Sequence, residues 1–251
     1  MKRPARFILT IGAVILLIAA TAGCLSFSPG ADVIVGNGQV IQQERQLNVP
    51  VTGAGTQSPI DLILDPELDG KVILDGESNI LDLVEVSQNN SGFVEIRFKK
   101  GVMISSFKTV KAYIPMPDGG LLETSSTGSI SAKNNASLTG DSLELKVSST
   151  GSITLNATVG ELTASSSSTG RISLTGEADT AMISLSSTGD FNGFDFKIVD
   201  ATVSVSSTGS ARVNVSGNLK GSISSVGNII YDGTPASINV TTSSIGQVKK
   251  R

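Results

Sequence analysis

The sequence predicts an all-β protein: a parallel β-solenoid (β-helix) with coils of roughly 19 residues, preceded by an N-terminal signal or anchor helix. Three observations lead to this prediction. A tetrapeptide recurs at a nearly constant interval through the second half of the chain. Apolar and polar residues alternate around each copy, which is the period of a β-strand. The repeating unit is also too short to bury a core alone, so consecutive units must stack.

The first 24 residues have the pattern of a lipoprotein-type signal peptide or membrane anchor. Three basic residues precede an almost unbroken apolar run, Phe7 to Ala20, as in an export signal. Thr21-Ala22-Gly23-Cys24 then resembles a lipobox, in which the cysteine becomes lipid-modified. Cys24 is the only cysteine of the chain and is the lipidation candidate.

An uncleaved anchor is the alternative for this segment. Residues 7–24 number 18, which is near the lower limit for a membrane-spanning helix. Both interpretations predict a body that is extracytoplasmic, with the N-terminus holding it to the membrane at the cell surface or envelope.

Residues 31–120 read as an irregular β region that forms the first part of the solenoid. Alternating segments occur at 60–64, 72–74, 81–86, 93–98 and 108–114, but the tetrapeptide is absent. The turn-rich stretch Pro115 to Gly120 separates this region from the repeats. We expect one continuous body in which the irregular region covers one end of the solenoid, because exposed strand edges invite aggregation.

Residues 121–251 contain seven repeats. Ser-Ser-Thr-Gly occurs at 125–128, 148–151, 167–170, 186–189 and 206–209, and variants with Val or Ile in place of Thr follow at 224–227 and 243–246. Successive glycines are 23, 19, 19, 20, 18 and 19 residues apart. They are the structural corner glycines of the predicted coils: Gly128, Gly151, Gly170, Gly189, Gly209, Gly227 and Gly246.

Two conditions could require glycine at each corner, a positive φ or a close approach of neighbouring backbone. The serines and threonines would satisfy local backbone groups in the turns. The single long interval contains Lys133-Asn134-Asn135, a polar insertion expected to bulge from the coil. A propeller blade needs about 40 residues, twice this unit, and a sandwich needs no fixed period, so both competing folds fit less well.

The composition argues against catalysis. The chain has no histidine and one cysteine, so the commonest general base and the commonest metal ligand are missing. The acidic residues of the repeats do not recur in register, and no aspartate accompanies each glycine as calcium-binding repeats require. We therefore predict no enzyme activity, no catalytic residue, no metal and no cofactor, with a Ser-Lys pair or a polysaccharide-active site as the weaker alternatives.

Charge excludes one class of partner. Without the signal, 16 basic residues face 22 acidic ones, which leaves a net charge of about −6. Nucleic acids need clustered Lys and Arg, and here only residues 99–100 and 249–251 are basic clusters. No nucleic acid partner is expected.

Two groups of side chains could form a ligand surface, and five sequons could carry glycans. Asp190 and Asp195 flank Phe191, Phe194 and Phe196, which would make either a sugar-binding ledge or a loop with inward-packed aromatics. Stacked threonines of the tetrapeptides could form a flat ladder, but ice-binding solenoids use two per rung. Five Asn-x-Ser/Thr sequons mark possible glycosylation at Asn89, Asn135, Asn156, Asn214 and Asn239.

Several stretches resemble the putative auto-transporter adhesin, head GIN domain family. They are Gly36-Asn37-Gly38, residues 44–49, residues 77–81 with 94–96, and the closing section from Ser224 to Gly246 with Gly227-Asn228-Ile229-Ile230-Tyr231-Asp232-Gly233-Thr234-Pro235. The resemblance covers most of the chain after residue 24. It implies a parallel β-helix that is exported and often lipid-anchored.

These observations favour a non-catalytic interaction or adhesion module at the cell surface, presenting a long polar face to a surface protein or a glycan. A self-associating structural scaffold of the cell envelope, built by addition at exposed solenoid ends, is the alternative. A smooth Ser/Thr/Asn face would favour the first function, and an open apolar end would favour the second.

Overall fold

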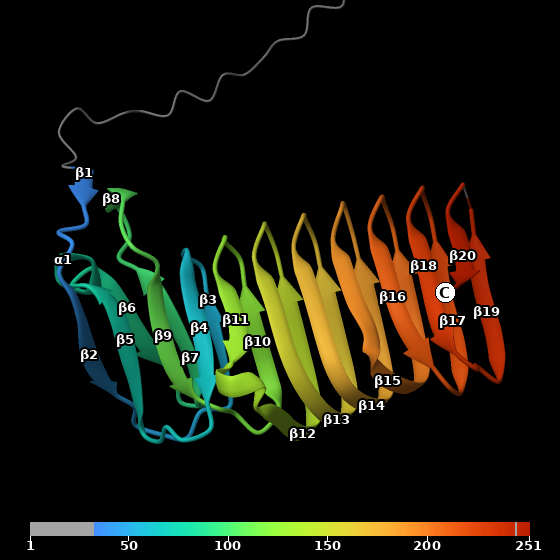
Figure 1. The fold of residues 1–251 in the computed structure, drawn as a ribbon, viewed down its shortest axis with the longest axis horizontal. Coiled ribbons are helices and arrows are strands. Elements are labelled where there is room, and N and C mark those ends of the chain that lie inside the picture. The colour runs from blue at the N-terminus through green and yellow to red at the C-terminus, as the bar shows by residue number, and fades with distance from the viewer. Residues whose placement is uncertain (1–32, 244) are drawn as a thin grey trace, which may run out of the picture. The chain divides into compact units, whose positions relative to one another are not determined.

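The computed structural model describes residues 33–243 and 245–251. The signal or anchor helix predicted over residues 1–24, with Cys24, lies outside these residues. Within them, no helix is long and apolar enough to cross a membrane. The β-solenoid prediction is confirmed, since almost all described elements are strands stacked in parallel coils (Figure 1).

The repeat region consists of coils that each contain two strand segments. Its elements are β10 (Gly120–Thr124), β11 (Ser129–Ala132), the 3-10 turn η1 (Lys133–Asn135), β12 (Ser137–Val147), β13 (Ser152–Ser166), β14 (Arg171–Leu185), β15 (Asp190–Val205), β16 (Ser210–Val215), β17 (Asn218–Ile223), β18 (Asn228–Gly233), β19 (Ser237–Thr242) and β20 (Gln247–Lys250). The long strands β12 to β15 bend between their two segments, whereas the last coils have separate strands. Two continuous parallel sheets result.

Stacked inward side chains form the core. Parallel pairing places Ile130 beside Ile153, Ile153 beside Ile172, and Ile172 beside Phe191. Each of these side chains is 0% exposed. Ala211 follows Phe191 in the same column, so a small residue compensates for the large ring. Alternate residues point outward, which explains the period of two in the sequence.

The tetrapeptide turns form one corner of every coil. Backbone hydrogen bonds join each turn to the one before it, for example from Ser148 N to Thr124 O at 2.9 Å and from Asp190 N to Gly170 O at 3.0 Å. None of the seven corner glycines has a positive φ. A Cβ on Gly151 would instead lie 2.8 Å from Gly128 O and 2.9 Å from Ser126 O. Of the two possible reasons for glycine, close approach of the preceding coil is the one that the structure supports.

Buried hydroxyl groups stabilise the same corner from inside. Thr124 Oγ1 donates to Gly128 O and Ser166 Oγ donates to Gly170 O, both at 3.2 Å. These side chains are 1% and 2% exposed and have partners for their polar atoms. The buried hydroxyl groups and the glycine carbonyl groups of these turns therefore satisfy one another's hydrogen bonds.

The first third of the body caps one end of the stack. Its elements are β1 (Val33–Val35), β2 (Val40–Gln46), β3 (Gly53–Thr56), β4 (Ile60–Asp65), β5 (Lys71–Glu77), α1 (Ser78–Leu81), β6 (Val84–Gln88), β7 (Phe93–Phe98), β8 (Met103–Ser106) and β9 (Val110–Pro115). Coil order here departs from chain order. β3 and β4 pair with β10 and β11, while the later strands β7 and β9 lie outside them.

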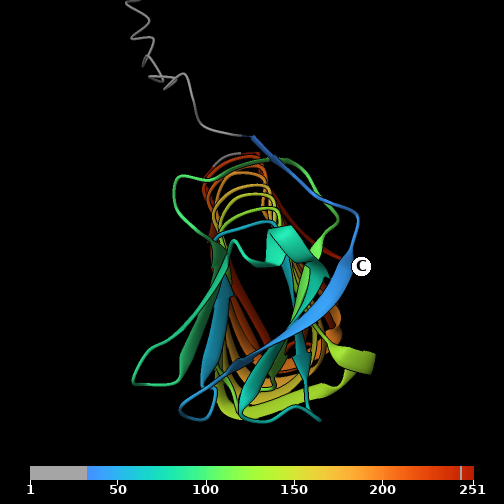
Figure 2. The same cartoon turned by 90° about the vertical axis from the view of Figure 1, so that its left-hand side faces the viewer.

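Antiparallel strands complete this end. β2 pairs with β5, β5 with β9, and β6 with β7. Helix α1 adds Ile80 and Leu81, which are both 0% exposed. Figure 2 faces this end and shows the blue β2 ribbon and the teal α1 in front of the stacked coils. The core is thereby covered at its beginning.

Glu77 fixes the loops of the cap. Its carboxylate accepts hydrogen bonds from Gly38 N at 2.6 Å and from Lys108 N at 2.7 Å, although the residue is only 4% exposed. The hydrogen bond from Lys108 N, followed by the one from Gly38 N, holds the pKa of Glu77 below its ordinary value. The charged form therefore stabilises the folded state.

The polar insertion after β11 lies on the surface as η1. Asn134 and Asn135 have φ values of 53° and 54°, which asparagine tolerates better than most residues. Lys133 Nζ lies 2.8 Å from both Asp65 Oδ2 and Glu67 Oε2, so the insertion is tied to the neighbouring coil. As expected, it leaves the pairing of β11 with β13 intact.

Replacing a corner glycine should destabilise the stack. Gly151→Ala would push a methyl group against Gly128 O and Ser126 O, and overpacking of this kind costs about 1 to 3 kcal/mol. Thr150→Ala, in the same turn but exposed, should change stability by less than about 0.5 kcal/mol. Urea unfolding of both variants would measure this, and equal stabilities would contradict the close-approach explanation.

Glu77→Gln should lower the melting temperature at neutral pH, because the amide group replaces one acceptor oxygen with a donor facing a backbone N–H. Since the pKa of Glu77 is lowered on folding, its contribution is full above the ordinary glutamate pKa and is lost as pH falls through the folded-state value. The gap between variant and native chain should therefore shrink in acid. Glu44→Gln, at an exposed ion pair with Lys71, is the control and should show no comparable gap.

Candidate functional site

The corner ridge is the most regular surface feature of the body. We define it as the turns at residues 125–128, 148–151, 167–170, 186–189, 206–209 and 224–227. The first and third residues of these turns are mostly exposed, while the glycines are buried. Because neighbouring strands lie about 4.8 Å apart, the ridge repeats its hydroxyl groups at that interval.

The ridge is not a row of free threonine hydroxyls. Thr169 Oγ1 donates to Ser149 O at 3.4 Å, and Thr208 Oγ1 donates to Ser187 O at 3.3 Å. Several serines likewise bond the preceding coil, as Ser206 Oγ does to Leu185 O at 3.4 Å. Hydroxyl groups held in this way have defined positions and keep acceptor capacity toward a ligand.

A second polar strip, the serine row, lies beside the ridge. It consists of outward-facing serines on consecutive strands: Ser165, Ser184, Ser204 and Ser222. Thr241 continues the row on β19, and Lys146 precedes it on β12. Ser204 and Ser222 share a hydrogen bond of 3.4 Å. Together, ridge and row make a face covered by small hydroxyl side chains.

The serine row brings a lysine beside a serine at one place, and a catalytic Ser-Lys pair does not fit the geometry there. Lys146 lies next to Ser165. Its ammonium group is 2.7 Å from Glu144 Oε1, and this hydrogen bond raises the pKa of Lys146. A lysine that activates a serine needs a lowered pKa instead.

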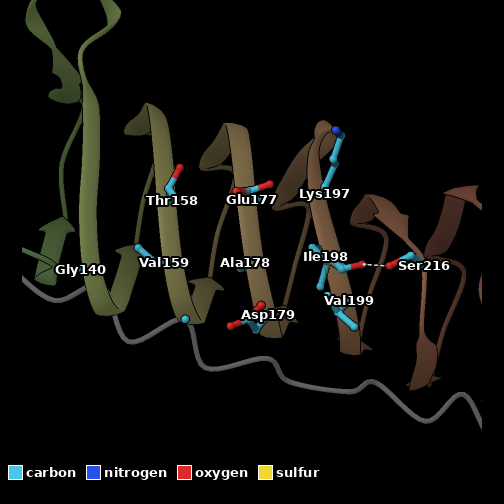
Figure 3. A pocket seen from close by; sticks show the side chains of 11 residues that line it. Gly140, Thr158, Val159, Glu177, Ala178, Asp179, Lys197, Ile198, Val199 and Ser216 are labelled. Carbon is cyan, nitrogen blue, oxygen red and sulfur yellow. Dashed lines mark hydrogen bonds between the residues drawn. The ribbon is translucent and has the colours of Figure 1, made fainter.

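The opposite side of the coils carries a shallow groove (Figure 3). It encloses about 570 Å³ along β13, β14 and β15. Thr158, Glu177 and Lys197 occupy one register row and line its polar flank. The floor of the groove is formed by three buried residues, Val159, Ala178 and Ile198. The groove has room for a polar chain but shows no nucleophile paired with a base.

Acidic residues gather at the corner next to this groove, which the sequence reasoning missed. Glu161 and Asp200 occupy one register row with Thr180 between them, and Asp141 and Asp179 lie one residue earlier in their coils. The prediction that acids do not recur in register was therefore wrong for Glu161 and Asp200. Counting from this corner, and not from the glycines, would have shown their spacing.

These acids do not form a metal centre. Asn218 N and Nδ2 donate to Asp200 Oδ1 at 2.7 and 2.8 Å, and these bonds lower the pKa of Asp200, so one of its two oxygens already has two partners. Across residues 33–243 and 245–251, no three Asp, Glu, Cys or His side chains are placed to share a metal ion.

The aromatic cluster does not form a sugar-binding ledge. Phe191 and Phe196 are 0% exposed and belong to the core. The guanidinium carbon of Arg251 lies 4.6 Å from the ring centroid of Phe194 and covers it. Asp190 is 3.9 Å from Arg212 Nη1. Phe191 and Phe196 therefore pack inward, but from strand β15 and not from a loop, and Phe194 is half-buried beneath Arg251.

The sequons differ in accessibility. Asn89, Asn135 and Asn239 are exposed, whereas Asn156 and Asn214 are half-buried. Asn214 Nδ2 also donates to Phe194 O at 3.1 Å. The first three are therefore the better glycosylation candidates.

Three solved structures have the same fold. A putative adhesin from Bacteroides fragilis NCTC 9343 is 19% identical with a TM-score of 0.79, over 87% of this chain and 100% of that one. A putative adhesin from Parabacteroides merdae ATCC 43184 is 20% identical with a TM-score of 0.66, over 88% and 100%. A putative lipid binding protein from Parabacteroides distasonis ATCC 8503 is 19% identical with a TM-score of 0.70, also over 88% and 100%.

Comparison with curated proteins gives no match. At identities near 20%, the likeness to solved structures concerns the fold. Residues 52–235, however, match the model of a family described as putative auto-transporter adhesin, head GIN domain. This match spans most of the chain and confirms the resemblance seen in its sequence. The chain thus belongs to the putative auto-transporter adhesin, head GIN domain family.

Proposed function

We propose that the protein is a membrane-anchored, non-catalytic interaction module whose hydroxyl-covered face binds a glycan or a surface protein. The observation that carries this proposal is the corner ridge with the adjoining serine row. Each coil contributes the same small donors and acceptors at one spacing, so a partner with a repeating polar structure could meet several coils at once.

The site has chemical properties suited to a glycan or a polar protein surface. Its side chains are short, so ordering them on binding costs little conformational entropy. Bulky apolar groups are scarce on the serine row, and Met182 beside it is an exception at 59% exposure. The family name is in line with an extracytoplasmic surface role. Anchoring through residues 1–24 and Cys24 is part of this proposal.

Changing the serine row should weaken binding. We expect Ser184→Glu with Ser204→Glu to reduce affinity for the ligand found in a glycan or cell-surface screen by about 10-fold or more, because each lost hydrogen bond is worth about 1 kcal/mol. Thr154→Glu with Asn192→Glu makes the same charge change at exposed positions of the other sheet and should leave binding unchanged. Equal losses of affinity in both double variants would show that the ligand does not bind at the serine row.

The scaffold alternative is favoured by one observation, the last described coil. β19 pairs only with β17 and β20 only with β18 among the described strands. Ile238 and Ile245 are 45% and 76% exposed there. Such an edge is a template for another chain.

Two inward positions of this coil oppose such addition. Thr242 follows Ile223 in register, and Lys250 follows Tyr231. An inward-pointing charge at a sheet edge prevents another strand from stacking, because the charge would be buried without a partner. We therefore favour display over polymerisation.

Sedimentation of the purified protein over a concentration series tests this choice. The native protein should not grow into rods, whereas Thr242→Ile with Lys250→Val should associate as concentration rises. Lys249→Val removes the same charge from an outward position, and this variant should show no more association than the native protein. Reversible growth of the native protein would support the scaffold instead.

A further inference from the structure

A small separate sheet projects an apolar face at the capped end of the body. β1 and β8 pair in parallel, with Val33 beside Met103 and Ile34 beside Ile104. Ile34 and Ile104 pack against the core. The outward residues Val33, Val35 and Met103 are 51%, 56% and 41% exposed. Figure 1 shows the two strands side by side at this end.

Two further apolar residues are exposed at the start of β2, where they point to opposite faces of the strand. Val40 and Ile41 are 48% and 39% exposed. The segment between β1 and β2 is fixed by hydrogen bonds from Gly36 N to Ser106 O at 2.7 Å and from Ser78 N to Gln39 O at 2.9 Å. We call Val33, Val35 and Met103 the N-terminal apolar face. Eleven large apolar side chains are exposed in the described part of the chain, and these are three of them.

Basic residues surround the same strand. Lys99 and Lys100 end two residues before β8, and Lys108 lies two residues after its last residue; all three are exposed. Lys99 Nζ donates to Asp82 O at 2.8 Å. The nearby carboxylates are Asp82, which is exposed, and Glu77, which is buried with its oxygens bonded to backbone N–H groups. In a body with a net charge of about −6, the three lysines give only the segment around β8 a local positive charge.

Chain length limits how far this face can lie from an anchored N-terminus. Nine residues lead from Cys24 to Val33, and a fully extended chain of nine residues spans at most about 30 Å. An apolar surface rimmed by lysines fits a bilayer, because apolar side chains enter the headgroup boundary while basic groups meet anionic lipids.

We propose that the N-terminal apolar face docks on the lipid surface of the membrane, with Lys100 and Lys108 directed at anionic headgroups. This inference rests on the proposed anchoring at the N-terminus. A second copy of the chain fits the face less well, because the three lysines of each copy would be brought together. Docking would hold the capped end against the bilayer and fix how the corner ridge is presented.

The test uses the full chain in lipid vesicles, with nitroxide labels on Met103→Cys or on Ile245→Cys. Ile245 is the matched control, since it is apolar, exposed and in the last coil. Collisions with a water-soluble relaxation agent should fall at least threefold at residue 103 relative to residue 245 when the vesicles contain anionic phospholipid. Lys100→Glu with Lys108→Glu should abolish that difference, whereas Lys249→Glu with Lys250→Glu should preserve it.

Anchoring is read separately, as the fraction of protein that stays with the vesicles after a high-salt wash. Protein that stays bound while both labels remain equally accessible would overturn docking but not anchoring. Protein that washes off would overturn the proposed anchoring instead. Protection at residue 103 that rises with protein density in the bilayer, together with crosslinks between copies, would assign the face to a second copy and overturn the lipid proposal.

Discussion

The backbone pairing of each coil with the next is the interaction on which the rest of the structure depends. Parallel hydrogen bonds fix a residue of one coil beside its counterpart in the next, as Ile153 beside Ile172. This register decides which side chains are buried, because a shift by one residue would turn the apolar set outward. The glycine corners allow the coils to approach closely enough for the pairing to continue through the turns, as in the hydrogen bond that Arg171 N donates to Gly151 O at 3.1 Å. The core, the corner ridge and the serine row all depend on this pairing of consecutive coils.

A stack of this kind has two ends, and this protein treats them differently. At its beginning, antiparallel strands and α1 cover the core, with Glu77 holding two loops through its carboxylate. In the last described coil, two of the inward positions are polar, with Thr242 and Lys250 where the preceding coil has Ile223 and Tyr231. Covering an edge and placing an inward charge on it are both known devices against edge-to-edge association in β-proteins. The different chemistry of the two ends gives the body a direction relative to any surface that it meets.

The lateral surfaces inherit the regularity of the stack. Because each coil places equivalent residues at one spacing, the Ser-Ser-Thr-Gly turns produce an ordered array of hydroxyl groups with little variation in shape. The opposite corner is different, since Asp141, Glu161, Asp179 and Asp200 give it a negative charge. The two sides of the coils therefore differ in chemistry, one covered by hydroxyl groups and one bearing carboxylates. The lysines around β8 add a basic region at the capped end.

Much of this protein was determined by its sequence alone, because repetition and strand period are local properties. The glycine interval predicted the coil length, and alternation predicted the inward residues such as Ile153 and Ile172. Tertiary structure alone decided the order of the cap, where β7 and β9 lie outside β3 and β4, since nothing local specifies which distant strands pair. It also decided that Glu161 and Asp200 share a row, and that Val33 meets Met103, 70 residues later in the chain. These contacts join residues far apart in sequence, and their energy depends on the packing of the whole stack.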